Sequence, residues 1–192
     1  MIADGKRGDV PVSATAYAEA LTSEGVGPLI DAFTVNPFTG ADSIEPFVQA
    51  AERSGSGVFV LVRTSNPGAS DFQDLPIDGG PLYRQVAGVV EGFADRLEGE
   101  CGLSGMGAVV GATRPEHLGE VREILPRSIF LIPGVGAQGG RPEDLAAAFG
   151  PGRAAALVNA SRSIARAEAP SRAAEELRHT LWEVSGAGSR RS

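Results

Sequence analysis

The sequence predicts an α/β fold made of repeated strand–helix units, of the (β/α)₈ barrel type. Six short apolar runs, most of them rich in β-branched residues, alternate with amphipathic helical segments. Such alternation favours a parallel sheet. Polar or glycine-rich segments follow nearly every run, and barrel enzymes keep their sites at the carboxyl ends of their strands. The alternative is an open doubly wound sheet, which concentrates its ligand contacts at one switch point.

The first three units precede residue 98. The run 58–62 is apolar throughout, as expected for a strand in a sheet that is covered on both faces. Asp42-Ser43-Ile44-Glu45 is a capping-type start for a helix. The expected strands are 1–4, 32–35 and 58–62, the expected helices are 12–23, 42–52 and 82–97, and 64–81 is a polar loop. On the first helix, one face carries Ala14, Tyr17, Ala18 and Leu21.

The last three units repeat the pattern at a shorter period. Thr113-Arg114-Pro115-Glu116 is a capping box with an early proline, and it opens a helix that ends near residue 125. The expected strands are 108–110, 129–132 and 155–158, and the further helices are 141–149 and 172–184. Residues 186–192 are small, polar and basic, which predicts a disordered tail after a single domain over 1–185.

The length predicts an incomplete barrel. A complete barrel has eight strands and typically about 250 residues. This chain has 192 residues and supplies six strands, the first of which begins at residue 1. We therefore expect a barrel that lacks its first two strand–helix units.

Composition excludes several classes of protein. The net charge of −7 argues against a general nucleic-acid binder. Cys101 is the single cysteine, so neither a disulfide framework nor a thiolate metal site is expected within one chain. Neither His117 nor His179 lies in a metal-ligand motif. No apolar run approaches the roughly 18 residues of a membrane span, and charges at Asp4 and Lys6 interrupt any signal peptide. These features favour a cytoplasmic location.

Charged residues follow the first strand. Asp4 and Lys6 are two positions apart, so a strand would direct both side chains to one face, whereas Asp9 comes after Gly8 and lies in the turn. An acid and an amine side by side at a strand end form either a structural ion pair or part of an active site.

A glycine-rich segment follows the fifth predicted strand. Residues 134–139 match G-x-G-x-x-G, but the acidic residue that a dinucleotide fold needs about 20 positions later is absent. Barrels often bind phosphate between the loops after their last two strands, which here are 134–140 and 159–162. Gln138 offers an amide and Arg162 a guanidinium for that purpose. The alternative is a tight turn beside a surface arginine. Ser65, after the third strand, either binds a ligand or forms a turn before Pro67.

Several motifs together resemble one family. The segment Asp4-x-Lys6-x-x-Asp9-Val10 followed by Ser13 resembles the signature of orotidine 5′-phosphate decarboxylase. Further motifs, similar to the bacterial subgroup often called type 2, are Thr34-Val35-Asn36-Pro37, Thr64-Ser65-Asn66-Pro67-Gly68 and Pro133-Gly134-Val135-Gly136-Ala137-Gln138-Gly139-Gly140. The resemblance runs in order from residue 1 to about residue 164.

The resemblance implies a role for each matched residue. Asp4 would lie against the substrate carboxylate, and Lys6 would stabilise and then protonate the C6 carbanion. Asp9 would reach across a homodimer interface into the partner's site. The implied substrate-binding residues are Val10, Ser13, Ser65, Pro133, Gln138, Gly139, Ser161 and Arg162. The substrate would be orotidine 5′-phosphate, with Ser65 on the pyrimidine and Gln138 and Arg162 on the phosphate; no cofactor or metal is implied.

The chain departs from the family pattern in three places. Ser13 replaces a usual threonine, and Ser161 replaces a common glycine. The family's first catalytic lysine and an aspartate that holds the ribose lie on two preceding strands, so we expect little or no decarboxylase activity from these residues alone. Two other functions stay open: a metal-dependent sugar-phosphate decarboxylase or synthase, which shares Asp-x-Lys-x-x-Asp, and a non-catalytic domain that binds a nucleoside monophosphate.

Overall fold

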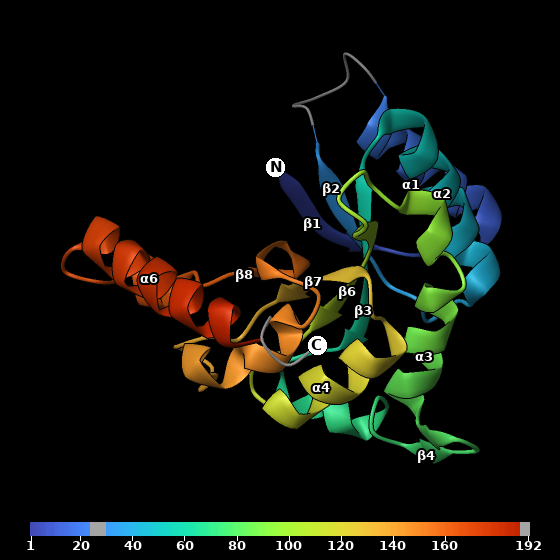
Figure 1. Cartoon of the computed structure of the whole chain (residues 1–192). Coiled ribbons are helices and arrows are strands. Elements are labelled where there is room, and N and C mark those ends of the chain that lie inside the picture. The colour runs from blue at the N-terminus through green and yellow to red at the C-terminus, as the bar shows by residue number, and fades with distance from the viewer. Residues whose placement is uncertain (24–29, 189–192) are drawn as a thin grey trace.

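The chain forms one twisted sheet of six parallel strands with helices on its outer side (Figure 1). The computed structural model describes residues 1–23 and 30–188. The strands are β1 (Ile2–Arg7), β2 (Ala32–Val35), β3 (Gly57–Arg63), β6 (Ser104–Val110), β7 (Ser128–Ile132) and β8 (Ala156–Val158). They lie in the order β1-β2-β3-β6-β7-β8, which is their order in the chain. The six predicted strands are confirmed, and β1 ends three residues later than expected.

The connections between the strands carry helices. The α-helices are α1 (Pro11–Thr22), α2 (Ala41–Ser54), α3 (Leu82–Glu91), α4 (Pro115–Ile124), α5 (Arg162–Ala165) and α6 (Pro170–Gly188). Short 3₁₀ helices are η1 (Pro67–Asp71), η2 (Ala94–Leu97), η3 (Pro142–Phe149) and η4 (Arg153–Ala155), and β4 (Pro76–Ile77) pairs with β5 (Gly80–Pro81) in a hairpin. The last helix, α6, extends away from the sheet in Figure 1.

The sheet is an open half-barrel. Because its strand order is linear, β1 and β8 are edge strands, each paired on one side within the described residues. A closed barrel of this type needs eight strands. The expectation of an incomplete (β/α)₈ barrel with six strand–helix units is therefore confirmed.

The main core lies between the sheet and the outer helices. Its largest side chains are Phe33, Phe47 and Phe130, which have no measurable exposure. Strand residues on this face alternate with residues that point the other way, as pleating requires. Ala14 and Ala18 of α1 are buried and Leu21 packs against this core, whereas Tyr17, predicted on the same face, is 38% exposed.

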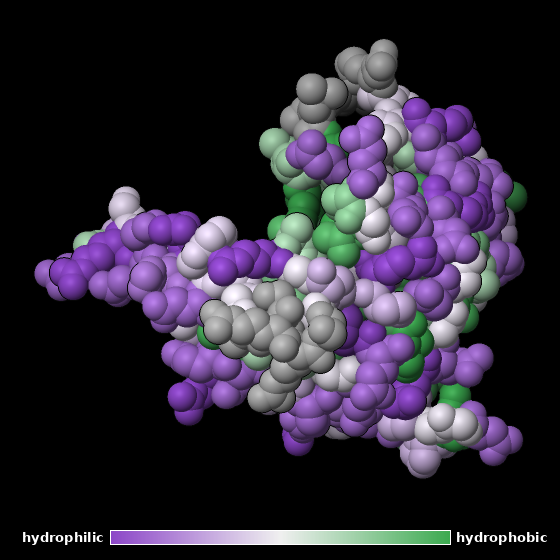
Figure 2. Space-filling model, in the orientation of Figure 1, coloured by the Kyte–Doolittle hydropathy of each residue, from purple (hydrophilic) through white to green (hydrophobic). Residues whose placement is uncertain are grey.

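The inner, concave face of the sheet is also apolar but is only partly covered. Ala32, Phe59 and Val109 are buried there, while Ile2, Leu61, Ile129 and Leu131 are half-buried around them. Leu157 of β8 is 44% exposed. Figure 2 shows hydrophobic side chains in the recess between the N-terminal strands and the C-terminal arm of the molecule.

A buried arginine supports β7 and β8 from the outer side. The Arg122 guanidinium donates to four carbonyl oxygens, those of Leu125, Ser128, Ala148 and Ala155, at 2.7–3.1 Å. It also lies 3.6 Å from the centre of the Phe130 ring. Burial lowers the pKa of Arg122 to about 9, so the group stays charged at neutral pH.

Local details differ from the prediction. Both predicted capping sequences fail, because the Thr113 hydroxyl donates to the Ser65 carbonyl and the Ser43 hydroxyl donates to the Thr39 carbonyl. The helix expected over 82–97 divides at Gly92 into α3 and η2, and the one over 141–149 is a 3₁₀ helix. The loop 64–81 contains η1 and the β4–β5 hairpin. Residues 186–188, predicted in the tail, belong to α6, and 189–192 lie outside the described residues.

Candidate active site

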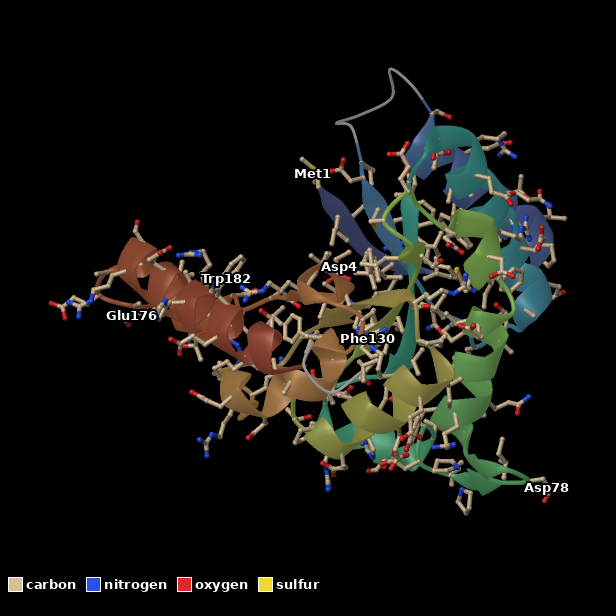
Figure 3. All side chains as sticks on the ribbon, in the orientation of Figure 1. Met1, Asp4, Asp78, Phe130, Glu176 and Trp182 are labelled. Atoms are coloured by element: carbon tan, nitrogen blue, oxygen red, sulfur yellow. The ribbon has the colours of Figure 1, made fainter. Side chains whose placement is uncertain are left out.

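Asp4 and Lys6 contact each other at the carboxyl end of β1. Lys6 Nζ donates to Asp4 Oδ1 at 2.5 Å. The Thr34 hydroxyl also donates to Asp4 Oδ1, at 3.0 Å, and accepts the Lys6 backbone N–H at 2.9 Å. In Figure 3 the labelled Asp4 lies on the side of β1 that faces away from α1 and α2. The predicted juxtaposition of the acid and the amine is therefore present.

A local irregularity of β1 produces this contact. Ala3 pairs with Phe33 and Arg7 pairs with Val35, so β1 has two more residues than β2 over the same span. Lys6 has a φ of +48°, the one positive φ among the described non-glycine residues. A side chain in this region is strained by about 1–3 kcal/mol, and such strain clusters at functional sites. The bulge directs Lys6 back toward Asp4.

The environment of Asp4 keeps its carboxylate ionised. Burial raises the pKa of Asp4, but the hydrogen bonds from Lys6 and Thr34 together outweigh it and hold the pKa below its ordinary 3.8. The side chains of Lys6 and Asp4 are 46% and 60% exposed. Asp4 is therefore ionised at neutral pH, and the pair is open to solvent.

Asp9 and its neighbours lie in the loop between β1 and α1. Asp9 Oδ1 accepts the Val10 backbone N–H at 2.7 Å, and the Asp9 carbonyl accepts the Thr39 hydroxyl at 3.5 Å. Val10 is 55% exposed, and Ser13 lies half-buried in the first turn of α1. Within the described residues, no hydrogen bond or ion pair joins Asp9 to Asp4 or Lys6. Its predicted role in a partner's site stays a prediction.

Ser65 and Gln138 meet although 73 residues separate them. The Ser65 hydroxyl donates to Gln138 Oε1 at 2.9 Å, and the Ser65 carbonyl accepts the Thr113 hydroxyl at 3.2 Å. Gly111 is required beside them, because a Cβ there would lie 2.7 Å from the Ser65 backbone. A hollow of about 380 Å³ opens next to this contact; it is lined by Arg63, Ser65, Asn66, Pro67, Ser70, Thr113, Arg114 and Gln138.

The glycine-rich loop after β7 folds back on itself. Gly140 donates to the Gly134 carbonyl at 3.0 Å and Gly136 donates to the Gly140 carbonyl at 2.9 Å, with positive φ at Gly134, Gly136 and Gly139. The Pro133 carbonyl accepts the Ala112 N–H at 2.8 Å. Among the residues that the structure describes, the N–H groups of Ala137 and Gln138 have no acceptor. Such a loop can donate to an anion.

Arg162 lies next to this loop. A Cβ on Gly136 would lie 2.9 Å from the hydroxyl of Ser163, so the segment after β8 approaches the loop closely. Ser161 and Arg162 are exposed, and the Arg162 side chain has no hydrogen-bond or ion-pair partner in the described part of the chain. The two predicted anion-binding loops are therefore neighbours, and a guanidinium is free beside them.

Three groups of residues thus lie at the same end of the strands, the carboxyl end. Asp4 and Lys6 follow β1, Ser65 follows β3, and Gln138 and Arg162 follow β7 and β8. In a parallel sheet, all of these are carboxyl ends. In the described residues, no hydrogen bond joins the Asp4–Lys6 pair to the others.

The sequence did not reveal the network that holds Ser65. Arg63 is 5% exposed, and its guanidinium binds both Asp74 carboxylate oxygens at 2.7 and 2.9 Å. The Gln73 side chain accepts the Thr64 backbone N–H at 2.8 Å. The sequence feature that could have predicted this network is Arg63 itself, a single charged residue at the end of an otherwise apolar strand. Thr34 was similarly detectable as a polar residue in a short apolar strand.

The described residues contain neither a membrane-spanning helix nor a cluster of metal ligands. No helix there is long and apolar enough to cross a membrane. No cluster of three or more His, Cys, Asp or Glu side chains is arranged to hold a metal ion.

Six parallel strands with polar residues gathered at their carboxyl ends place the chain among the β/α-barrel proteins. A family model described as "Orotidine 5'-phosphate decarboxylase / HUMPS family" matches residues 1–177. The chain belongs to this family.

Its relatives agree with this assignment. It is 48% identical over 169 residues to an orotidine 5′-phosphate decarboxylase of Rhodopirellula baltica, covering 85% of this chain and 56% of the relative. It is 49% identical over 165 residues to one of Haloarcula marismortui, covering 85% and 55%. The chain therefore spans about half the length of the curated relatives that it matches.

Solved structures show the same fold. A putative orotidine-monophosphate decarboxylase from Toxoplasma gondii aligns with a TM-score of 0.84 at 35% identity, covering 99% of this chain and 69% of that one. Orotidine 5′-monophosphate decarboxylase from Methanocaldococcus jannaschii, solved with the inhibitor BMP, aligns with a TM-score of 0.71 at 27% identity, covering 94% and 72%. The resemblance predicted from the motifs is confirmed.

Proposed function

We propose that this chain carries the lysine–aspartate and phosphate-binding parts of an orotidine 5′-phosphate decarboxylase, which releases CO₂ from its substrate to give uridine 5′-monophosphate. The observation that carries the proposal is the 2.5 Å contact between Lys6 and Asp4, at the same sheet edge as the Ser65–Gln138 contact. One end of a nucleotide would meet the charged pair and the other the glycine-rich loop.

Lys6 is the group suited to the chemical step. Loss of CO₂ leaves an electron pair on C6, and a fixed ammonium stabilises such a charge in a water-excluded site. Lys6 then protonates that carbon. Two unit charges about 4 Å apart attract by roughly 4 kcal/mol at an effective dielectric constant near 20, so one lysine supplies only part of the rate enhancement. Asp4, lying against the substrate carboxylate, would raise the ground-state energy and hold Lys6 in place.

The loops after β7 and β8 are suited to the phosphate. Gln138 and the free N–H groups of its loop can donate to phosphate oxygens, and Arg162 supplies a cation. Pro133, Gly139 and Ser161 would line this subsite, while Ser65 would contact the pyrimidine. Binding energy from the phosphate, remote from C6, can be used to close and desolvate the site.

We further propose a homodimer in which Asp9 reaches the partner's site. Exposed apolar residues lie near it: Val10 and Val12 follow it in the chain, and Phe38 precedes Thr39, whose hydroxyl donates to the Asp9 carbonyl. They are 55%, 85% and 87% exposed. Exposed apolar patches of this kind mark protein–protein contacts. Val10 and Ser13 would lie beside Asp9 in the shared site. We place the protein in the cytoplasm, without nucleic acid or membrane partners.

Alone, the described half-barrel should turn over little substrate. Lys6 and Asp4 are half exposed, so water screens the charges on which the step depends. Binding of a nucleoside monophosphate without turnover is the expected behaviour. A sugar-phosphate decarboxylase or synthase is the second candidate. Two features favour the pyrimidine nucleotide instead: the Arg7-Gly8 pair, which lies between Asp4 and Asp9, and the loop that contains Ser65.

Thermal-shift titrations of the purified chain test this proposal. Uridine 5′-monophosphate should raise the melting temperature, and ribulose 5-phosphate should not. Gln138→Ala and Arg162→Ala should each remove most of the shift, whereas Arg172→Ala, on an exposed residue of α6 paired with Glu176, should keep it. A larger shift with ribulose 5-phosphate would favour the second candidate. Loss of orotidine 5′-phosphate absorbance reports turnover in the same samples.

A further inference from the structure

The loop after β3 begins with a buried arginine whose donors all turn back into the loop. Arg63 is 5% exposed. Its Nε and Nη2 donate to the two Asp74 carboxylate oxygens at 2.7 and 2.9 Å, and its Nη1 donates to the Thr64 carbonyl oxygen. A two-pronged contact of this kind fixes the orientation of both partners as well as their distance. The Thr64 carbonyl belongs to the peptide group that leads into Ser65, so this peptide is joined to the far end of the loop.

Gln73 holds Thr64 from its other side. The Gln73 side-chain oxygen accepts the Thr64 backbone N–H at 2.8 Å, and its side-chain nitrogen donates to the Thr64 hydroxyl at 3.0 Å. Thr64 is therefore bound at its N–H, its carbonyl and its hydroxyl. We call Arg63, Gln73 and Asp74 together the loop clamp.

The far end of the loop is fixed to the start of α3. The Gln73 carbonyl accepts the Tyr83 backbone N–H at 2.9 Å. The Leu75 carbonyl accepts the Leu82 backbone N–H, also at 2.9 Å. Asp74 lies between these two anchored residues, and Tyr83 is 2% exposed. The carboxylate that orients Arg63 is thus part of the supported framework of the outer helices.

We propose that the loop clamp positions Ser65 for the nucleotide without itself contacting the ligand. Ser65 follows Thr64 directly, and its hydroxyl donates to Gln138 Oε1 at 2.9 Å. Releasing Thr64 would let the next peptide group rotate, which would move the Ser65 hydroxyl away from Gln138. The inference rests on the proposed function, because Ser65 and Gln138 are the residues proposed to meet the pyrimidine and the phosphate.

A second arginine fork of the same geometry provides the comparison. Arg96 Nε and Nη2 donate to the two Glu52 carboxylate oxygens at 2.8 and 2.9 Å. This fork joins η2 to α2 on the outer side of the sheet, outside the proposed site. A fork that serves stability alone should affect ligand binding as little as this one does.

A double-mutant cycle tests the inference in the full chain. Asp74→Asn and Gln73→Ala should each weaken binding of uridine 5′-monophosphate about three- to tenfold, measured by isothermal titration. In a Ser65→Ala background, each change should have less than about a twofold effect, because the residue through which it acts is altered. Glu52→Gln is the matched control and should leave the affinity unchanged. Gln73→Ala removes no charge, so it keeps the test decisive where Asp74→Asn lowers stability.

NMR signals of the Gln138 side-chain amide provide a readout that needs no ligand. In the free chain, Asp74→Asn and Gln73→Ala should shift them in the same direction as Ser65→Ala, and Glu52→Gln should not move them. Unchanged Gln138 signals, unchanged affinities in the single variants, or losses that add fully in the double variants would overturn the inference. If the wild-type chain did not bind uridine 5′-monophosphate, the proposed function would fail, while the Gln138 signals would still decide whether the clamp positions Ser65.

Discussion

The middle of the sheet and its β1 edge hold polar residues in different ways. After β3, Ser65 is fixed from both sides: its hydroxyl donates to Gln138 and its carbonyl accepts from Thr113. Behind it, Arg63 is buried against Asp74. At β1, Asp4 and Lys6 bind each other and Thr34, and both are about half exposed. The middle has neighbouring strands on both sides, while within residues 1–23 and 30–188 β1 has a neighbouring strand on one side only.

This difference distinguishes the residues proposed to bind the nucleotide from the pair proposed to react with it. Ser65, which is proposed to contact the pyrimidine, lies where the sheet is supported on both sides, and the proposed reacting pair lies where support is partial. Electrostatic catalysis depends on groups that are held in place in a site shielded from water. Binding a ligand therefore requires less of the barrel than catalysing a reaction on that ligand.

The largest effect is expected from Arg122, which supports β7 and β8 on the side of the sheet opposite β1. Arg122→Met removes the donor for four buried carbonyl oxygens. We expect a loss of about 3–5 kcal/mol in the free energy of unfolding, measured by urea denaturation. Arg172→Met, at an exposed ion pair with Glu176, should stay within about 0.5 kcal/mol. Equal urea midpoints for the two variants would show that Arg122 does not support β7 and β8.

Asp74 should have the next largest effect, with a defined pH dependence. Asp74→Asn leaves the buried Arg63 without its counter-charge, and since Asp74 is 33% exposed we expect a cost of about 1–3 kcal/mol. The hydrogen bond from Arg63 lowers the pKa of Asp74 below 3.8 in the folded state. The stabilisation is therefore complete above about pH 3.8 and is lost as the pH falls through the folded-state pKa. A difference between parent and variant that persists unchanged at pH 2 would contradict this account.

Ser65 provides a smaller test of the same region. Ser65→Ala removes the bond to Gln138 and should cost about 0.5–1.5 kcal/mol in stability. It should also weaken binding of uridine 5′-monophosphate, because Gln138 loses its anchor. Ser23→Ala is the control, since that exposed hydroxyl at the end of α1 donates to the Glu19 carbonyl one turn earlier. Isothermal titration of both variants decides the matter, and equal affinities would disprove the anchoring role.

The smallest effect on stability is expected at the edge. Lys6→Met removes an exposed ion pair, so the unfolding free energy should fall by about 1 kcal/mol or less. Added salt should reduce this difference further. The pKa of Asp4 should rise toward 3.8, which NMR titration can follow. A loss greater than that of Asp74→Asn would reverse the comparison between edge and middle.

Much of this arrangement could be predicted from the sequence. Continuous apolar runs such as that of β3 identified the six strands. The spacing of Asp4 and Lys6 predicted that they share a face, but not the bulge that brings them into contact. The loops of Ser65 and Gln138 were expected at one edge because each follows a parallel strand. The sequence did not predict the long-range hydrogen bonds. The Thr113 hydroxyl donates to the Ser65 carbonyl rather than capping its own helix, and Arg63 binds Asp74, which lies eleven residues later in a loop.

Hydrogen exchange on the free chain tests the central contrast most directly. Amides of β3 and β6 should exchange far more slowly than those of β1, because in the part of the chain that the structure describes β3 and β6 are paired on both sides and β1 on one. Uridine 5′-monophosphate should then slow exchange in residues 134–140 while β1 remains unprotected. Equal protection of β1 and β3 in the free chain would contradict the account of a supported middle and an unsupported edge.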